Sequence, residues 1–145
     1  MISKIGSLVA LGIALLGVFF LIDKNHIFSK NPIAIIIQLC SLVLMIWARF
    51  TFGLRSFHAT ANTTKGELVT NGPYRWFRHP IYAAIIYFFL ATVISYPFIE
   101  TVGAVILICG GLFVRMVLEE KFLNEEYVEY AEYSKRTKRI IPFVF

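Results

Sequence analysis

Residues 72–82 read Gly-Pro-Tyr-Arg-Trp-Phe-Arg-His-Pro-Ile-Tyr, and apolar runs of membrane-spanning length lie on both sides of them. The stretch has a turn at one end and a helix start at the other, with arginines, a histidine and aromatic residues between. Such a density of polar and ring-bearing side chains between two apolar segments is unusual for a simple linker. We therefore take residues 72–82 as the candidate site and expect the rest of the chain to hold it at a membrane surface.

The composition is that of an integral membrane protein. The 145 residues suit a single domain. Of these, 58% are hydrophobic and only 16% are charged, and the mean hydropathy is +0.72, well above the range of soluble globular domains. The apolar residues are gathered in blocks long enough for a bilayer. We expect one all-α integral membrane domain over residues 1–145.

The net charge of +5 comes from Lys and Arg residues that flank the apolar runs. The positive-inside bias of membrane proteins explains this arrangement, so no nucleic-acid partner is expected. Cys40 and Cys109 lie inside apolar runs without a Cys or His nearby in the sequence. We expect both to be small buried hydrophobic residues, and we expect no metal site.

Four apolar runs predict about four transmembrane helices. The first is too long for a signal-peptide core and has no Ala-x-Ala cleavage site, so it is predicted to be a retained anchor whose glycines permit close helix packing. A Tyr-Pro turn joins the last two runs into a helix hairpin. At 1.5 Å per residue the third helix is about 24 Å long, which is short for a hydrocarbon core of ~30 Å. The predicted spans are residues 5–22, 33–48, 81–96 and 99–118.

Two polar residues interrupt these runs. Gln38 lies in the middle of the second, where a buried amide most often makes a hydrogen bond between helices. Arg115 lies inside the fourth, where a charge is costly and faces a partner or a water-filled cavity. Glu119 follows four residues later on the same helix face. One interpretation is that Arg115 and Glu119 form an intrahelical ion pair near the interface. The other is that Arg115 binds a substrate anion and the Glu119 carboxylate binds a second ligand.

Residues 119–139 are dense in charge, with aromatic residues at spacings of three and four, which predicts a C-terminal amphipathic helix. The connection between the second and third runs is rich in Lys and Arg, whereas residues 96–100 contain none. The positive-inside rule therefore puts the N-terminus, this connection and the C-terminal helix on the cytoplasmic side. The candidate site and the acidic helix then share one membrane face.

The chemistry of residues 72–82 is open to two interpretations. Pro80 suits the first turn of a helix, and the free N–H groups of that turn, with Arg75 and Arg78 nearby, would favour a carboxylate or a phosphate beside His79. Alternatively, the two arginines contact lipid headgroups and the neighbouring aromatic residues form an interfacial belt.

Several other chemistries find no support in the sequence. It contains no Cys/His cluster with metal spacing, no Gly-x-Ser-x-Gly elbow, no P-loop and no Gly-x-Gly-x-x-Gly. A proton-relay transporter would need more carboxylates within the spans.

The ordered motifs resemble a known family. The chain reads Leu-Val-Thr-x-Gly-Pro-Tyr-Arg at 68–75, Arg-His-Pro-x-Tyr at 78–82, Glu-Glu-x-x-Leu at 119–123 and Ile-Pro at 141–142. This combination resembles the isoprenylcysteine carboxyl methyltransferases, whose broader group includes phospholipid N-methyltransferases and small-thiol methyltransferases. The resemblance covers residues 52–145.

This resemblance implies S-adenosyl-L-methionine-dependent methyl transfer at the cytoplasmic membrane face, with residues 51–145 as the cofactor-binding and catalytic core. It implies a lipid-like methyl acceptor drawn from the membrane. Arg115 matches the family arginine near the substrate carboxylate, and together with Glu119 it forms the implied catalytic pair. The implied cofactor-binding residues are Glu67, Leu68, Val69, Tyr74, His79, Pro80, Ile81, Tyr82 and Glu119.

The acceptor is left open among an isoprenylcysteine, a phospholipid amine and a small thiol, and Arg115 favours one with a carboxylate. An alternative of another class is a non-catalytic membrane module that binds anionic lipid or a partner through its basic loop and amphipathic helix.

Overall fold

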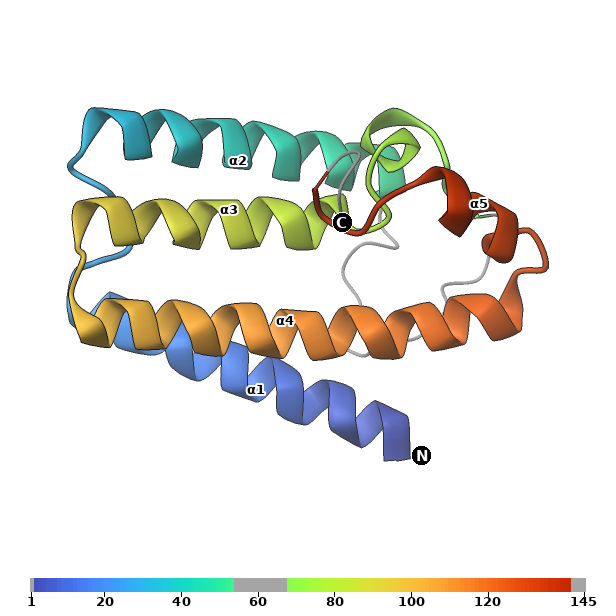
Figure 1. Cartoon of the computed structure of the whole chain (residues 1–145), viewed down its shortest axis with the longest axis horizontal. Coiled ribbons are helices and arrows are strands. Elements are labelled where there is room, and N and C mark those ends of the chain that lie inside the picture. The colour runs from blue at the N-terminus through green and yellow to red at the C-terminus, as the bar shows by residue number, and fades with distance from the viewer. Residues whose placement is uncertain (1, 54–67, 142–145) are drawn as a thin grey trace.

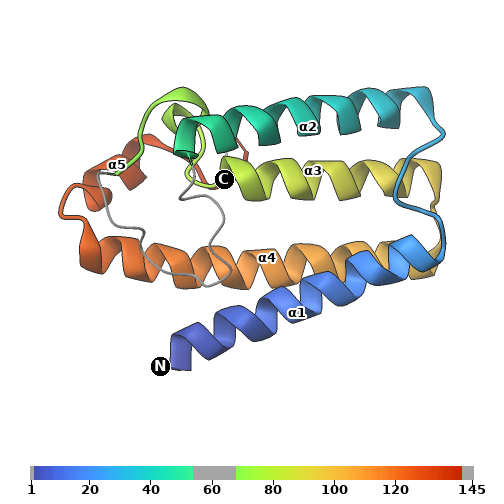
Figure 2. The same cartoon turned by 180° about the vertical axis from the view of Figure 1, so that it is seen from behind.

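The protein is all-helical in the computed structural model, which describes residues 2–53 and 68–141. Within these ranges, α1, α2, α3 and α4 lie nearly side by side in the order α2, α3, α4, α1 (Figures 1 and 2). The connections after α1 and α3 lie at one end, and the candidate site lies at the other. The elements are α1 (Ile2–Asp23), α2 (Pro32–Phe52), the 3-10 helix η2 (Gly72–Arg75), α3 (Pro80–Ser95), α4 (Ile99–Glu126) and α5 (Tyr130–Arg136).

Three of these helices, α1, α2 and α4, are long and apolar enough to cross a membrane. Large aliphatic side chains such as those of Leu16, Val43 and Ile106 are exposed on their outer faces, as hydrocarbon surroundings require. Helix α3 is apolar but has only 16 residues. The chain is therefore a multi-pass membrane protein, and a fourth span at α3 stays a prediction.

The C-terminal part differs from the single amphipathic helix predicted over residues 119–139. Helix α4 continues past Leu118 to Glu126, and the backbone then becomes extended at Tyr127 before the seven-residue α5. The break turns the chain back toward the other helices, so that Tyr130 and Tyr133 are buried. Hydropathy marks where an apolar surface ends, which need not be where the helix ends.

Glycines bring α1 and α4 into close contact. A Cβ atom at Gly17 would lie 2.6 Å from the carbonyl oxygen of Ala104, and one at Gly111 would lie 2.4 Å from that of Ala10. Neither distance leaves room for a side chain, so the two backbones touch, as small residues allow in membrane helices. The predicted packing role is confirmed at Gly17, whereas Gly12 faces open space.

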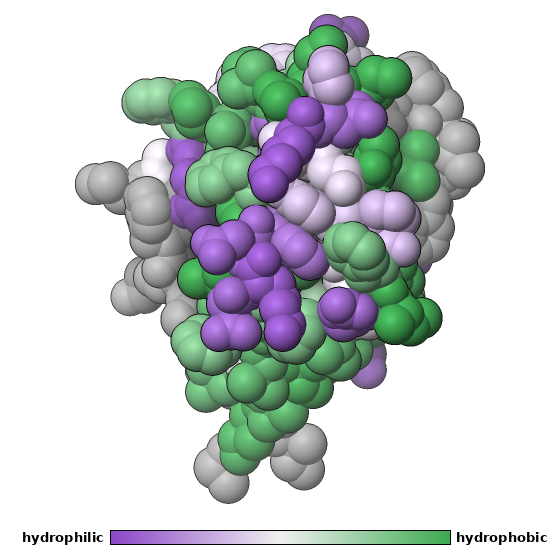
Figure 3. All heavy atoms as spheres, turned by 90° about the vertical axis from the view of Figure 1, so that its left-hand side faces the viewer, coloured by the Kyte–Doolittle hydropathy of each residue, from purple (hydrophilic) through white to green (hydrophobic). Residues whose placement is uncertain are grey.

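Gln38 connects neighbouring segments as predicted. Its side-chain oxygen accepts from the Ser29 N–H at 3.0 Å, and its Nε2 donates to the carbonyl oxygens of Ile27 at 2.8 Å and Phe88 at 3.4 Å. These bonds make Gln38 a structural residue. At the same end of the molecule, exposed polar side chains form a cap that is ringed by apolar ones (Figure 3).

The prediction for the cysteines is wrong in part. Cys40 is exposed on α2 and Cys109 is partly buried, and both are free thiols. In a membrane protein the outward face is also apolar, so an apolar sequence run does not tell which of its residues face the interior.

Candidate active site

The 3-10 helix that opens the candidate site depends on a glycine. Gly72 has a φ of +56°, a value that side chains disfavour, and a Cβ there would lie 2.6 Å from Oγ1 of Thr51 at the end of α2. Pro73 follows in the first turn, and the Trp76 N–H donates to its carbonyl at 3.1 Å. This tight turn buries Tyr74.

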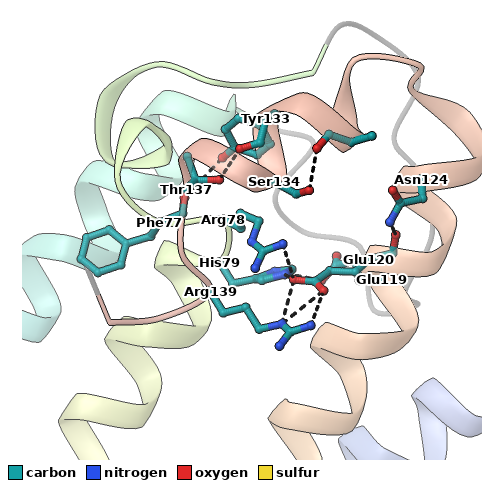
Figure 4. Close-up of polar contacts among 11 residues, drawn as sticks. Phe77, Arg78, His79, Glu119, Glu120, Asn124, Tyr133, Ser134, Thr137 and Arg139 are labelled. Carbon is teal, nitrogen blue, oxygen red and sulfur yellow. Dashed lines mark hydrogen bonds and ion pairs between the residues drawn. The ribbon is translucent and has the colours of Figure 1, made fainter. Parts of the chain in front are cut away.

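The segment after α5 lies along residues 76–79 in a short parallel pairing (Figure 4). The N–H groups of Arg78 and His79 donate to the carbonyls of Lys138 at 2.6 Å and Arg139 at 3.1 Å. Tyr133 adds a hydroxyl bond of 2.7 Å to the Tyr74 carbonyl. The backbone N–H of His79 is therefore engaged by the chain itself, and the anion that we expected beside the first turn of α3 stays a prediction.

The imidazole of His79 lies between two carboxylates of α4 (Figure 4). Its Nε2 is 3.2 Å from Oε1 of Glu120, and its Nδ1 is 3.8 Å from Oε2 of Glu119. The two glutamates differ in access, because the Glu119 side chain is 26% exposed and that of Glu120 only 10%. Glu119 is thus the carboxylate that an incoming ligand can reach.

The Glu120 carboxylate contacts two arginines of the site. Arg139 holds it through a forked contact, with Nη2 at 2.9 Å from Oε2 and Nε at 3.1 Å from Oε1. Arg78 approaches through Nη1 at 3.5 Å. The hydrogen bond to Glu120 raises the pKa of Arg139 above its ordinary value. A charge-assisted fork of this kind fixes the segment after α5 against α4.

Arg115 joins three helices. Its Nε donates to the Tyr82 hydroxyl of α3 at 3.3 Å, and its Nη1 donates to the Ser7 carbonyl of α1 at 3.4 Å. The Tyr82 ring also stacks on that of His79 with centroids 5.6 Å apart, and the His79 Nδ1 lies 3.8 Å from Glu119 Oε2. The structure thus brings together His79, Tyr82, Arg115 and Glu119, all predicted from the sequence.

Tyr74 belongs to the same cluster. Burial, followed by the nearby charge of Glu119, raises its pKa, so the phenol stays protonated at neutral pH. Its ring lies 5.5 Å from that of Phe52, centroid to centroid. Tyr74 therefore presents a neutral, buried aromatic ring next to the accessible carboxylate.

The other predicted site residues have looser connections to this cluster. Pro80 is buried and begins α3, and Ile81 is partly buried beside it. Leu68 and Val69 are partly buried ahead of η2, and Glu67 lies outside the described residues. Their contacts with a cofactor stay predictions. Within the described part of the chain, no group of three or more His, Cys, Asp or Glu residues is arranged to hold a metal ion.

Sequence reasoning missed Glu120, Arg139, Tyr133 and Ser7. Glu120 was visible as the second member of the Glu-Glu pair, but only the first was chosen. The others contact the site across long stretches of sequence, which no local pattern reports.

The fold and the site define an all-helical membrane protein with a buried charged cluster at one end of its helices. A family model described as phospholipid methyltransferase matches residues 29–130. The chain belongs to this family. The match includes η2, α3 and α4, which supply most of the cluster.

A curated relative is protein-S-isoprenylcysteine O-methyltransferase of Xenopus laevis, which is 29% identical over 138 residues. The alignment covers 84% of this chain and 44% of the relative, so the chain spans less than half of that protein's length. No solved structure matches the chain.

Proposed function

We propose that this chain is an integral membrane S-adenosyl-L-methionine-dependent methyltransferase, most like the isoprenylcysteine carboxyl O-methyltransferases. It acts on a lipid-like or carboxylate-bearing acceptor at the cytoplasmic face of a four-span bundle, with both termini on that side. One observation carries the proposal: His79, Tyr82, Arg115 and Glu119 meet at one end of apolar helices in a member of a methyltransferase family.

The side chains present suit the cofactor. Its sulfonium carries a positive charge, which aromatic faces such as those of Tyr74 and Tyr82 attract. Its ammonium and hydroxyl groups need an acceptor, and Glu119 is an accessible carboxylate. Its carboxylate needs donors, and among the described residues Arg78 Nε and the Tyr130 hydroxyl are buried without a hydrogen-bond partner.

When bound, the cofactor supplies an electrophilic methyl group. An acceptor carboxylate is already ionised at neutral pH, so the protein needs no strong general base. Its tasks are to align the acceptor and to exclude water. Arg115 would bind the carboxylate through its planar fork, and Tyr82 and Glu119 would hold the guanidinium and the cofactor on the same side.

A lipid-like acceptor also needs a place for its chain. A hollow of about 170 Å³ lies between α2 and α3, and its walls are apolar side chains such as those of Leu42, Ile85 and Phe88. The apolar lining of this hollow suits part of a hydrocarbon chain that stays in the bilayer.

The direct test is calorimetric titration of the detergent-solubilised protein with S-adenosylhomocysteine. We expect His79→Ala and Glu119→Ala to weaken binding at least about tenfold, because each removes a charged or hydrogen-bonding contact. Arg75→Ala and Glu125→Ala are matched controls, since both residues are exposed, Arg75 four residues before His79 in the chain and Glu125 on the same helix as Glu119. A folded wild-type protein that does not bind would refute the proposal.

A phospholipid N-methyltransferase is the second candidate, and the family description favours it. Tritium transfer from labelled cofactor separates the candidates when the protein is given N-acetyl-S-farnesylcysteine, phosphatidylethanolamine vesicles or a small aliphatic thiol. Label in the first sample supports the carboxylate acceptor. Failure to bind cofactor, together with vesicle binding that falls steeply with salt, would instead support the non-catalytic membrane module.

A further inference from the structure

The buried guanidinium of Arg115 is held from two sides. Helix α3 offers the Tyr82 hydroxyl, and α1 offers the backbone carbonyl of Ser7. Arg115 is only 4% exposed and Ser7 is fully buried. Helix α1 lies outside residues 29–130, the segment that the family model matches, so the family alone does not imply this contact.

The distance between Ser7 and Arg115 is fixed by a backbone contact one helical turn away. Gly111 precedes Arg115 by four residues on α4, and Ala10 follows Ser7 by three residues on α1. A Cβ at Gly111 would lie 2.4 Å from the Ala10 carbonyl oxygen and 3.0 Å from the Ala14 Cβ. Because a backbone atom fills this space, any side chain at position 111 must displace α1 next to Ser7.

We infer that α1 is a part of the acceptor site, in which the Ser7 carbonyl is a positioning group for Arg115. This inference rests on the proposed function. A charge at this depth requires polar partners, and two partners on different helices fix the plane and direction of the guanidinium fork. The guanidinium then meets an acceptor carboxylate in one orientation, so less conformational entropy is lost when the Arg115 side chain binds it.

Adjacent glycines of α4 provide a matched test. Gly111→Ala places a methyl group against α1, whereas a methyl group at Gly110 would have no heavy atom of another described segment within 4 Å. With N-acetyl-S-farnesylcysteine and labelled cofactor, we expect Gly111→Ala to lower kcat/KM for the acceptor at least about tenfold, because small misplacements of a positioned group are costly. The Kd of S-adenosylhomocysteine should stay within about twofold, since Glu119 and His79 are not displaced. Gly110→Ala should match the wild type in both.

Gly17→Ala separates positioning from loss of helix packing. It creates a comparable clash with α4, 2.6 Å from the Ala104 carbonyl oxygen, but several turns from Arg115. We expect it to lower the thermal stability and to keep kcat/KM. If Gly111→Ala does not fold, Gly6→Leu decides, because it adjoins Ser7 and meets the flexible Leu118 side chain at 3.5 Å.

The outcomes are distinct. The inference is overturned if Gly111→Ala folds and keeps the wild-type kcat/KM, or if Gly17→Ala loses as much kcat/KM as Gly111→Ala. If Gly111→Ala does not fold, wild-type kinetics of Gly6→Leu overturn it. Each of these results leaves the proposed function intact. A wild-type protein that transfers no label to any acceptor refutes the proposed function, and the inference with it.

Discussion

The two ends of the helix bundle use polar groups in opposite ways. At the end that joins α1 to α2 and α3 to α4, neutral groups pair with one another: Ser29 Oγ donates to the Ala91 carbonyl at 3.2 Å, and Ser95 Oγ accepts from the Asn31 N–H at 3.0 Å. At the other end, Glu120 is shared by Arg78, His79 and Arg139. The first arrangement closes the helices, whereas the second concentrates buried charge.

Buried charge is a weak source of stability, because desolvation offsets much of the attraction within each pair. The neutral end achieves closure without that cost. The charged end is therefore better explained by chemistry than by folding, and the comparison makes predictions that can be ranked by size.

The largest effect is expected at Glu120. Glu120→Ala leaves Arg78 and Arg139 without their shared carboxylate; removal of one member of a fully buried pair costs about 3–5 kcal/mol, and the cost here is at the lower end because the Arg139 side chain is 30% exposed. Thermal unfolding in detergent should show the loss, and S-adenosylhomocysteine binding should fall with it. Glu125→Ala, an exposed change on the same helix, should stay within about 0.5 kcal/mol. If Glu120→Ala and Glu125→Ala are equally stable to thermal unfolding, the proposed difference between the charged end and the neutral end is wrong.

A smaller effect is expected at Gln38, which serves the neutral end. Gln38→Leu removes the bonds to the Ser29 N–H and the Ile27 carbonyl and should cost about 1–3 kcal/mol, because buried partners are left unpaired. Cofactor affinity should not change in the protein that remains folded. A loss of affinity comparable to that of His79→Ala would show that the two ends are coupled.

The smallest effect is expected at Tyr133. Tyr133→Phe removes the hydroxyl bond to the Tyr74 carbonyl and should cost about 1 kcal/mol at neutral pH.

Tyr133 also predicts a pH dependence. Burial raises its pKa from 10.0 to about 12. A raised pKa favours the protonated phenol in the folded state, so this contribution is complete below pH 10 and is lost as the pH rises toward 12. Wild-type stability should therefore fall over this interval more steeply than that of Tyr133→Phe. Parallel curves would contradict this assignment.

The sequence was sufficient for features that depend on local pattern. Apolar blocks predicted α1 and α2 to within a few residues and the first residue of α4, and four-residue spacing put Arg115 and Glu119 on one face. The sequence did not reveal contacts between residues that are far apart in the chain. The Ser7 carbonyl meets Arg115 across 108 residues, and His79 meets Glu120 across 41. Hydropathy also could not show that Cys40 faces outward or that α4 continues to Glu126.

The parallel pairing of Phe77 with Lys138 has a consequence for biosynthesis. Residue 77 is synthesised before α3 and α4, and its partner Lys138 is synthesised only after both. The wall of the site is thus the last part of the chain to assemble, after the apolar helices have entered the membrane. If α3 or α4 were inserted wrongly, the protein would still lie in the bilayer and its helix content would still be that of a folded protein. The candidate site, however, would not form.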